Sequence, residues 1–353
     1  MKILLYGLGF RLFIDRRIHS GTIMKTRKIK IISTGTGLPE KILHDFELDE
    51  ILGLPRGETF RLTGVRKRYQ SVHETAAMLA AQACRKALMN SSLKWDDIDC
   101  LVATSATMDK ALPYNAAMIH SELGLNQRRT TTFDVGASCM SFLTGLDMIS
   151  YAVDAGRFRN VMFVSSDVSA FTVDYKNLRE NGIFGDGAAA VIISRSKENE
   201  SSCIVHSDTV TVSEGVDFCR IDSGGTRYHR RTENSNADAF FEMNGRGVFA
   251  LASKEITPFM NNLFLRSGCR MEDIDIVVPH QASRLGIDHI ASRLNIPKEK
   301  LVDVFAEHGN QVGASLPTAL HFGISSGKIQ RGNKVLFIGT GAGLTIGGMV
   351  MIY

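Results

Sequence analysis

The chain contains an internal duplication, which limits its possible folds more than any other feature. The segment DDIDCLVATSA (96–106) matches EDIDIVVPHQA (272–282) by identical or similar residues at most positions. Further on, IHSELGL (119–125) resembles IASRLNI (290–296), and the tetrapeptide VGAS occurs once in each half. These matches follow the same order at spacings of 171 to 177 residues. We therefore expect two structurally similar halves that pack against each other.

Each half is expected to alternate short strands with longer helices. Four apolar runs without alternation, CLVATS, VMFVSS, IVVPH and VLFIGTG, are typical of strands covered on both faces. Helical patterns at 75–89 and 141–156 separate such runs. This order predicts an α/β fold with largely parallel sheets and crossover helices. The two halves would pack about a pseudo-twofold axis, with helices buried between the sheets.

The division between the halves is placed near residue 200. Residues 24–200 form the first half, which carries the candidate nucleophile, and residues 201–353 form the second, with the polar stretch 200–240 as an irregular connection. Residues 1–23 are interpreted as an N-terminal extension that need not be structured. Its apolar run is short, is interrupted by Arg11 and lacks a cleavage site, so we expect no signal peptide. No other segment reaches the length of a membrane span.

Charge and cysteine content exclude several classes of protein. The 353 residues include 41 basic and 37 acidic side chains, so the net charge of +4 is too balanced to predict binding to nucleic acid or to an anionic membrane. The six cysteines form no CxxC pair, which is typical of reduced thiols in a cytoplasmic protein. We expect no metal, no nucleic-acid partner and no membrane partner.

The stretch DVGASCMSF (134–142) is the first candidate for chemistry. Cys139 follows a run of small residues, which includes VGAS at 135–138, and precedes an apolar segment. A nucleophile on a strand-to-helix elbow needs such small residues, because the backbone turns sharply and a substrate must come close. A buried structural cysteine at a tight core crossing fits the same letters. The residues of this stretch alone leave both interpretations open.

Three further features follow predicted strands at equivalent positions. His280 follows DIDIVVP, Asn310 lies in FAEHGNQVGAS, and the glycine-rich IGTGAGLTIGG (338–348) contains Ala342. Ligands bind beyond the carboxyl ends of parallel strands, so these features and Cys139 are predicted to converge. Taken singly, His280 fits a strand-end histidine and Asn310 fits a turn residue.

The quoted segments resemble motifs of a known family. DVGASCMSF, VPHQAS, HGNQVGASLPTAL and GAGLTIGG are similar to those of 3-oxoacyl-(acyl-carrier-protein) synthase III, of the thiolase superfamily, and the resemblance covers about residues 28–353. It implies a homodimer with a thiolase-like fold, in which the duplicated αβ halves form a five-layer αβαβα sandwich. The implied reaction is a decarboxylative Claisen condensation of an acyl thioester with malonyl-acyl-carrier protein, which gives a 3-oxoacyl thioester.

The resemblance also implies a role for each candidate residue. Cys139 would form the acyl-enzyme, with its thiolate favoured by the N-terminus of the following helix. The backbone N–H groups of Cys139 and Ala342 would form the oxyanion hole. His280 and Asn310 would donate to the enolate oxygen that forms when the malonyl group loses carbon dioxide. Acyl-CoA or acyl-carrier protein would supply the acyl group, without a cofactor.

The sequence departs from the family at positions that concern the primer. Glu58 and Leu62 stand where the family usually carries a tryptophan and an arginine that hold the CoA adenine. This departure predicts a divergent synthase with a primer other than acetyl-CoA. Met140 and Leu112 are predicted to line the acyl pocket. Leu112 would reach the pocket of the partner subunit, where leucine leaves more room than an aromatic residue.

Other functions of the same superfamily stay in consideration. A thiolase would carry a second cysteine in the final glycine-rich loop, whereas the last cysteine here is Cys269. A thiolase-fold acyltransferase would move the acyl group from Cys139 to a non-carbon nucleophile, and a ketosynthase of specialised metabolism would use the same residues. The presence of His280 and Asn310 favours decarboxylative condensation over simple acyl transfer. It also favours an enzyme over an inactive partner subunit.

Overall fold

The computed structural model describes residues 26–226 and 239–353 of the chain. The predicted N-terminal extension, residues 1–23, lies outside the described residues. Part of the predicted connection between the halves lies outside them as well. Among the residues that are described, no helix is both long and apolar enough to cross a bilayer.

The first sheet has five strands in the order β1-β7-β6-β4-β5. These are β1 (Ile29–Gly37), β7 (Gly187–Arg195), β6 (Asn160–Asp167), β4 (Cys100–Ala103) and β5 (Thr131–Asp134). Strand β4 runs parallel to β5 and β6, whereas β7 is antiparallel to both of its neighbours. β4, β6 and β7 are fully buried over most of their length because helices cover both faces of the sheet.

The second sheet repeats this arrangement with four strands in the order β11-β12-β13-β8. They are β11 (Ile276–Pro279), β12 (Lys334–Gly341), β13 (Thr345–Ile352) and β8 (Cys203–Thr211). β11 and β12 are parallel, and β13 is antiparallel to β12 and β8. The expectation of largely parallel sheets was therefore wrong, because each half contains a strand that returns beside its predecessor. For β12 and β13 the short intervening turn allows only antiparallel pairing.

The structure also corrects the expected connection between the halves. Residues 203–211 were expected to be irregular but form β8, whose partner β13 comes from the end of the chain. The polar side chains of this strand hid its pairing, because the strand lies at an edge of its sheet and only part of it is buried. The division of the chain near residue 200 stays a prediction.

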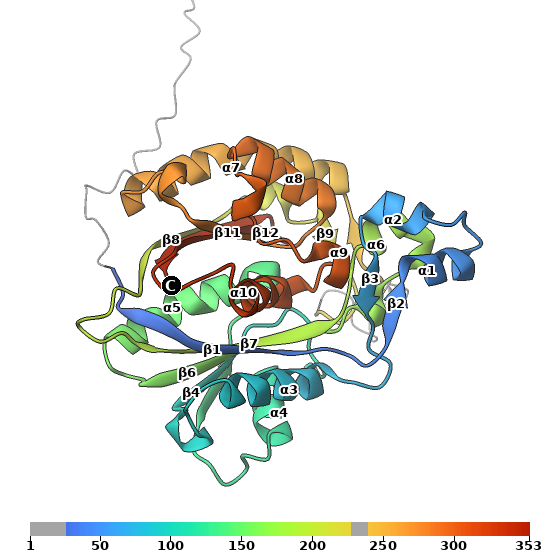
Figure 1. The fold of residues 1–353 in the computed structure, drawn as a ribbon. Coiled ribbons are helices and arrows are strands. Elements are labelled where there is room, and N and C mark those ends of the chain that lie inside the picture. The colour runs from blue at the N-terminus through green and yellow to red at the C-terminus, as the bar shows by residue number, and fades with distance from the viewer. Residues whose placement is uncertain (1–25, 227–238) are drawn as a thin grey trace, which may run out of the picture.

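Five layers are stacked, as Figure 1 shows. Helices cover the outer face of the first sheet, lie between the two sheets, and cover the outer face of the second sheet. In that order the pairs are α3 (Ala76–Met89) with α4 (Asn115–Glu122), α5 (Ser141–Asp154) with α10 (Ser315–Ser325), and α7 (Gly245–Ser267) with α8 (Arg284–Arg293). The predicted helices at 75–89 and 141–156 correspond to α3 and α5. The predicted αβαβα sandwich is confirmed.

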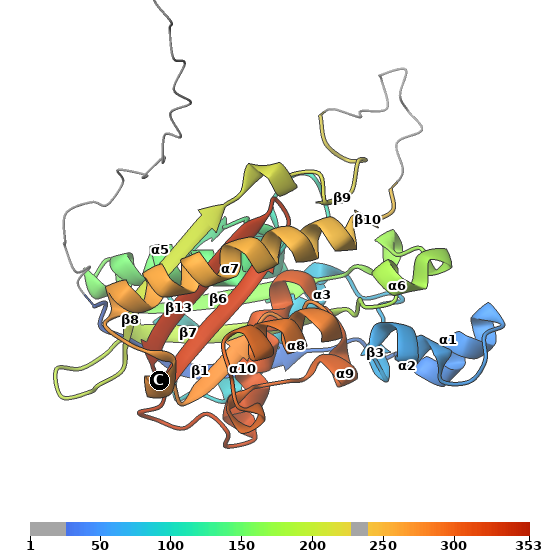
Figure 2. The same ribbon diagram turned by 90° about the horizontal axis from the view of Figure 1, so that it is seen from above.

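Smaller elements lie at one end of the sandwich, as Figure 2 shows. They are β2 (Ile42–His44), α1 (Asp45–Leu52), α2 (Glu58–Thr63), β3 (Lys67–Tyr69), α6 (Leu178–Asn181) and α9 (Phe305–His308). A second two-stranded ribbon pairs β9 (Cys219–Arg220) with β10 (Glu242–Met243).

The core between the sheets is built around α5 and α10. Helix α5 buries Phe142, Leu143 and Leu146, and the ring of Phe142 packs edge-on against that of Phe163 of β6 at 6.3 Å. Gly145 lets this helix lie close to β4, because a Cβ there would come within 2.7 Å of Thr104. The burial of α5 on both sides holds the turn that precedes it, which carries Cys139.

Candidate active site

The structure brings the three predicted residues into one region. Cys139 lies in a short 3-10 turn, η2 (Ser138–Met140), directly before α5, and His280 directly follows β11. Gly339 of β12 lies between these segments: a Cβ there would come within 2.6 Å of both His280 Cβ and Met140 Cε. Asn310 follows α9, and the turn after it packs against η2. The predicted convergence at the carboxyl ends of the strands is therefore seen in the fold.

The surroundings of Cys139 disfavour its charged form. Burial, together with the nearby Asp167 and Cys219, raises the pKa of the thiol to about 12, and burial is the largest cause. The backbone N–H groups of Cys139 and Ala342 donate to the sulfur and act in the opposite direction. The expected stabilisation of a thiolate by the helix was wrong, because desolvation outweighs it. The N–H groups themselves are those predicted for the oxyanion hole.

His280 is held in its neutral form. The residue is 3% exposed, and burial lowers the pKa of its imidazole to about 4. Its backbone N–H donates to Ile338 O at 2.8 Å, which ties the residue to β12. Nδ1 is buried and has no hydrogen-bond partner among the described residues. A neutral imidazole carries one N–H, so His280 can donate one hydrogen bond at neutral pH.

The amide of Asn310 has a defined orientation. Its Oδ1 accepts from Val312 N at 2.9 Å and from Ser315 Oγ at 3.3 Å, while its Nδ2 donates to Ala282 O at 3.2 Å. Because Oδ1 is occupied by two donors, Nδ2 faces the His280 segment. One of the two N–H bonds of Nδ2 is used by Ala282, and the other stays available for a ligand.

Asp167, at the carboxyl end of β6, belongs to the site although no sequence motif predicted it. Its side chain is fully buried, and its oxygens accept from Ala106 N at 2.8 Å, Thr107 N at 2.7 Å and Ala314 N at 3.2 Å. Burial raises the pKa of this carboxyl to about 6. Asp167 thus joins a loop of the first half to the turn before α10. A carboxylate that ends the apolar run VMFVSS was the available signal.

The two predicted pocket residues lie in different surroundings. Met140 is fully buried, and its sulfur and methyl group pack against Gly339 and Gly347. Leu112 is 77% exposed in the loop after β4. A contact of either residue with the acyl chain stays a prediction. His308 is buried between the rings of Tyr69 and Phe322.

The side chains of the described residues indicate which kinds of ligand the structure can hold. All six cysteines are free, and the residues at 26–226 and 239–353 include no group of three or more His, Cys, Asp or Glu arranged to hold a metal ion. A cavity of about 450 Å³ lies beside α6 and the β9–β10 ribbon, lined in part by Asn181, Arg220 and Phe241.

Family models match both halves of the chain. One described as 3-oxoacyl-(acyl-carrier-protein) synthase III matches residues 133–213, and one described as the C-terminal part of that protein matches residues 264–353. The first contains Cys139, and the second contains His280 and Asn310. The motifs that carry the resemblance therefore lie in the matched regions.

Whole-length relatives agree with these matches. A beta-ketoacyl-(acyl-carrier-protein) synthase III from Aquifex aeolicus is 30% identical over 326 residues, covering 92% of this chain and 99% of the relative. One from Clostridium acetobutylicum is 30% identical over 325 residues, covering 92% and 98%.

Solved structures share the fold over nearly the whole chain. That of 3-oxoacyl-(acyl-carrier-protein) synthase III from Aquifex aeolicus matches with a TM-score of 0.82 at 29% identity, covering 92% of this chain and 100% of that one. The synthase III structure from Pseudomonas aeruginosa also gives 0.82, at 27% identity, covering 93% and 98%. Xanthomonas campestris OleA, at 21% identity and a TM-score of 0.81, shows the same fold. With its duplicated halves, its motifs and these relatives, the chain belongs to the 3-oxoacyl-(acyl-carrier-protein) synthase III family, acyltransferases that catalyse a Claisen condensation.

Proposed function

We propose that the protein condenses an acyl thioester with malonyl-acyl-carrier protein through an acyl-enzyme on Cys139. One observation carries this proposal: two neutral hydrogen-bond donors, His280 and Asn310, are held beside the turn of the nucleophile. Uncharged donors can stabilise an enolate without first attracting the malonyl carboxylate, which must leave as carbon dioxide. Acyl transfer to a non-carbon nucleophile would not need this pair.

In the first half-reaction, the sulfur of Cys139 attacks the thioester carbonyl of the acyl donor. The new S–C bond replaces the S–C bond to the departing thiol, and the proton of Cys139 leaves with that thiol. The N–H groups of Cys139 and Ala342 lie within hydrogen-bonding distance of the sulfur, so they can turn to the tetrahedral oxyanion that forms next to it. The raised pKa of Cys139 keeps the thiol protonated until an acyl donor binds.

In the second half-reaction, the malonyl thioester loses carbon dioxide and becomes an enolate. Nε2–H of His280 and Nδ2–H of Asn310 donate to its thioester oxygen. The carbanion attacks the acyl carbonyl, a C–C bond forms, and the bond to Cys139 sulfur breaks. The sulfur then takes a proton from solvent, and the 3-oxoacyl thioester leaves on the carrier protein.

The primer is proposed to be other than acetyl-CoA. Glu58 pairs with Arg61 on the surface of α2, with 2.5 Å between Oε1 and Nη2. Leu62 packs against an apolar cluster that includes Leu48 and Leu178. These residues replace the tryptophan and arginine expected for a CoA adenine site. A donor that depends less on adenine contacts, such as an acyl-carrier protein or a longer acyl-CoA, fits these replacements.

A homodimer in the cytoplasm is proposed as the working form. Strand β5 is an edge strand of the first sheet, and the neighbouring loop exposes Leu112 and Tyr114. An edge strand flanked by exposed apolar side chains is suited to pairing with a second copy of the chain. Such pairing would bring Leu112 to the acyl pocket of the partner subunit. The free thiols fit a reducing compartment.

The proposed function can be tested by measuring the two half-reactions separately. The protein is incubated with a panel of acyl-CoAs and acyl-carrier proteins, and the mass of the Cys139 peptide reports acylation. Release of carbon dioxide from malonyl-acyl-carrier protein reports the second step. We expect Cys139→Ala to abolish the mass increase. Asn310→Asp should keep acylation but lower carbon dioxide release by about a hundredfold or more, because a negative charge replaces a donor.

Three outcomes would contradict the proposal. Acylation that persists in Cys139→Ala would assign the nucleophile elsewhere. Equal loss of both half-reactions in Asn310→Asp would remove the specific role of this residue in decarboxylation. Transfer of the acyl group to an amine or alcohol without release of carbon dioxide would indicate the alternative acyltransferase.

A further inference from the structure

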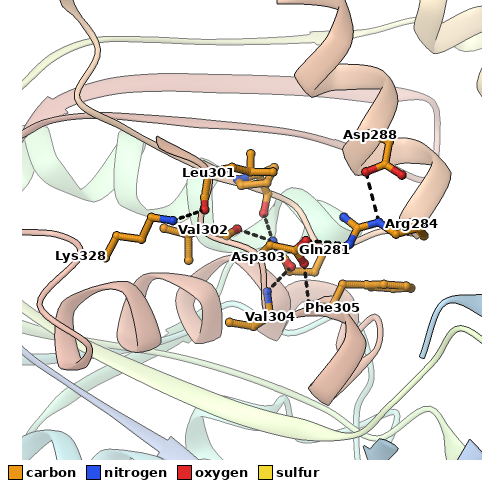
Figure 3. Close-up of polar contacts among 10 residues, drawn as sticks. Gln281, Arg284, Asp288, Leu301, Val302, Asp303, Val304, Phe305 and Lys328 are labelled. Atoms are coloured by element: carbon orange, nitrogen blue, oxygen red, sulfur yellow. Dashed lines mark hydrogen bonds and ion pairs between the residues drawn. The ribbon is translucent and has the colours of Figure 1, made fainter. Parts of the chain in front are cut away.

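Gln281, the residue after His280, lies at the centre of a buried network. Figure 3 shows it between the end of β11 and the segment 301–305 that leads into α9. Its side chain is 1% exposed and belongs to neither the nucleophile nor the proposed donor pair. A long polar side chain at such a depth is unusual and requires partners for its amide.

The amide of Gln281 contacts backbone groups from two segments. Nε2 donates to Pro279 O at 2.8 Å and to Val302 O at 3.2 Å, and Oε1 accepts from Val304 N at 3.0 Å. Both N–H bonds and the carbonyl oxygen are therefore used. The side chain fastens the end of β11, immediately before His280, to the chain that leads toward Asn310.

These contacts belong to a closed ring of chain and hydrogen bonds, which runs from Gln281 through Val304 and Asn310 back to Ala282. From Val304 the chain enters α9 (Phe305–His308), turns at Gly309, and reaches Asn310. Gly309 has a φ of 66°, and a Cβ there would lie 2.7 Å from Ile183 O, so this turn has little freedom. Nδ2 of Asn310 donates to Ala282 O at 3.2 Å, next to Gln281, and this bond closes the ring.

Other contacts support the same segment from its outer side. Arg284 Nη1 lies 2.6 Å from Asp303 Oδ2, and Asp303 Oδ1 accepts from Phe305 N at 3.2 Å (Figure 3). The side chains of Arg284 and Asp303 are 33% and 31% exposed, so solvent screens their attraction. The contacts of Gln281, two of which are fully buried, are the stronger constraint on the inner side.

From this ring, we propose that Gln281 is a positioning residue that sets the placement of Asn310 relative to His280, and thereby the geometry of the enolate site. This inference rests on the proposed roles of His280 and Asn310. Glutamine suits the position because two carbonyls need donors and one N–H needs an acceptor. Glutamate would face both carbonyls with oxygen, and methionine would leave all three backbone groups without a partner.

The test uses Gln281→Glu and Gln281→Met in the full chain, with melting temperatures to identify folded variants. We expect acylation of Cys139 to stay within twofold of the unaltered protein in both. We expect kcat for carbon dioxide release from malonyl-acyl-carrier protein to fall tenfold or more, with KM changed less than threefold. Asp288→Asn is the control: its side chain is 63% exposed, pairs with Arg284, and should leave both rates unchanged.

A double variant separates positioning from a general loss of structure. If Gln281 acts through Asn310, the loss of decarboxylation in Gln281→Met with Asn310→Asp should be clearly smaller than the product of the two single losses. Multiplicative losses, equal loss of both half-reactions, or unchanged decarboxylation in a folded Gln281 variant would each overturn the inference. If Asn310→Asp alone fails to separate the half-reactions, the proposed function has failed instead.

Discussion

Cys139 and His280 both lie in surroundings that favour their uncharged forms. Burial raises the pKa of the Cys139 thiol to about 12 and lowers that of the His280 imidazole to about 4. At neutral pH the site therefore holds a thiol and a neutral imidazole, not an ion pair. The nucleophile becomes reactive when an acyl donor is present and the thiol proton can leave with the departing thiol.

The pH dependence of alkylation tests this state. With a thiol pKa of about 12, the thiolate fraction of Cys139 should rise about tenfold for each pH unit between pH 7 and 10. The rate of iodoacetamide addition, followed by the mass of the Cys139 peptide, should rise in the same proportion. A midpoint near pH 8.5, with a plateau above about pH 9.5, would show instead an ordinary solvated thiol.

The turns before α5 and α10 show what the duplication preserves. Each turn begins at a residue with a φ of 51°, Ser138 and Val312, where a side chain is strained. Each is also closed by a serine hydroxyl: Ser141 Oγ accepts from Ala137 N at 2.8 Å, and Ser315 Oγ accepts from Gln311 N at 2.9 Å. In this equivalence between the halves, Cys139 of the first half corresponds to Gly313 of the second.

The two VGAS segments are therefore not structural equivalents. In the first half, only the last residue of VGAS, Ser138, lies in η2. In the second half, VGAS forms the whole turn η8 (Val312–Ala314) and the first residue of α10. The duplication is real, but this match is shifted by three residues. The second half has glycine where the first has Cys139, because there is no room for a side chain. A Cβ on Gly313 would lie 2.9 Å from both Asp167 Oδ2 and Thr104 O.

Adding one methyl group at Gly313 tests this packing. Gly313→Ala should lower the free energy of unfolding by about 1–3 kcal/mol, because neither the buried carboxylate nor the backbone carbonyl can move freely. Gly136→Ala is the control, since a Cβ there would meet no atom within 4 Å. Denaturant unfolding of both variants gives the comparison. Equal stability of the two variants would contradict the close approach of Asp167.

At the scale of the whole molecule, one buried arginine connects both sheets through the central helix layer. Arg27, just before β1, donates from Nη2 to Asp147 of α5 at 2.7 Å and to Ser207 of β8 at 2.6 Å. Nη1 donates to Tyr151 OH at 3.0 Å. The side chain of Arg27 is 2% exposed, so loss of the guanidinium leaves Asp147 without its cation in a poorly solvated place.

Neighbouring ion pairs provide a matched test of this connection. Arg27→Met should lower the free energy of unfolding by about 3–5 kcal/mol, the usual result of breaking a buried pair. Lys28→Met removes an exposed pair with Glu198 and should cost less than about 1 kcal/mol. Arg27→Met with Asp147→Leu should recover part of the loss. If Arg27→Met is no worse than Lys28→Met, the connection does not stabilise the fold.

Dimer formation would determine the size of the acyl pocket. Leu112 is exposed in the single chain, and its proposed effect on substrate choice would act across subunits. Leu112→Phe should shift the preferred donor toward acetyl or propionyl groups, because each methylene lost from burial changes binding by about 0.8 kcal/mol, or roughly fourfold. Acylation of Cys139 by a panel of donors measures the shift. An unchanged chain-length profile would remove Leu112 from the pocket.

The sequence was sufficient for features that local patterns encode. The apolar runs and helical periods of CLVATS, VMFVSS and 75–89 located β4, β6 and α3, because burial on both faces leaves a periodic signal. The repeat predicted two similar halves, and the family resemblance implied their five-layer arrangement. The motifs around Cys139, His280 and Asn310 predicted which side chains meet, since each follows a strand at the same edge of its sheet.

Only the tertiary structure decided features that depend on distant partners. The place of β7 between β6 and β1, and the pairing of β13 with β8, join strands that lie far apart in the chain. The partners of Asp167 and Gln281 were decided by the fold, because their hydrogen bonds are made to backbone groups, which leave no residue pattern in the sequence. The neutral state of Cys139 was missed for the same reason: local sequence indicates a helix N-terminus, but desolvation depends on all the segments packed around the sulfur.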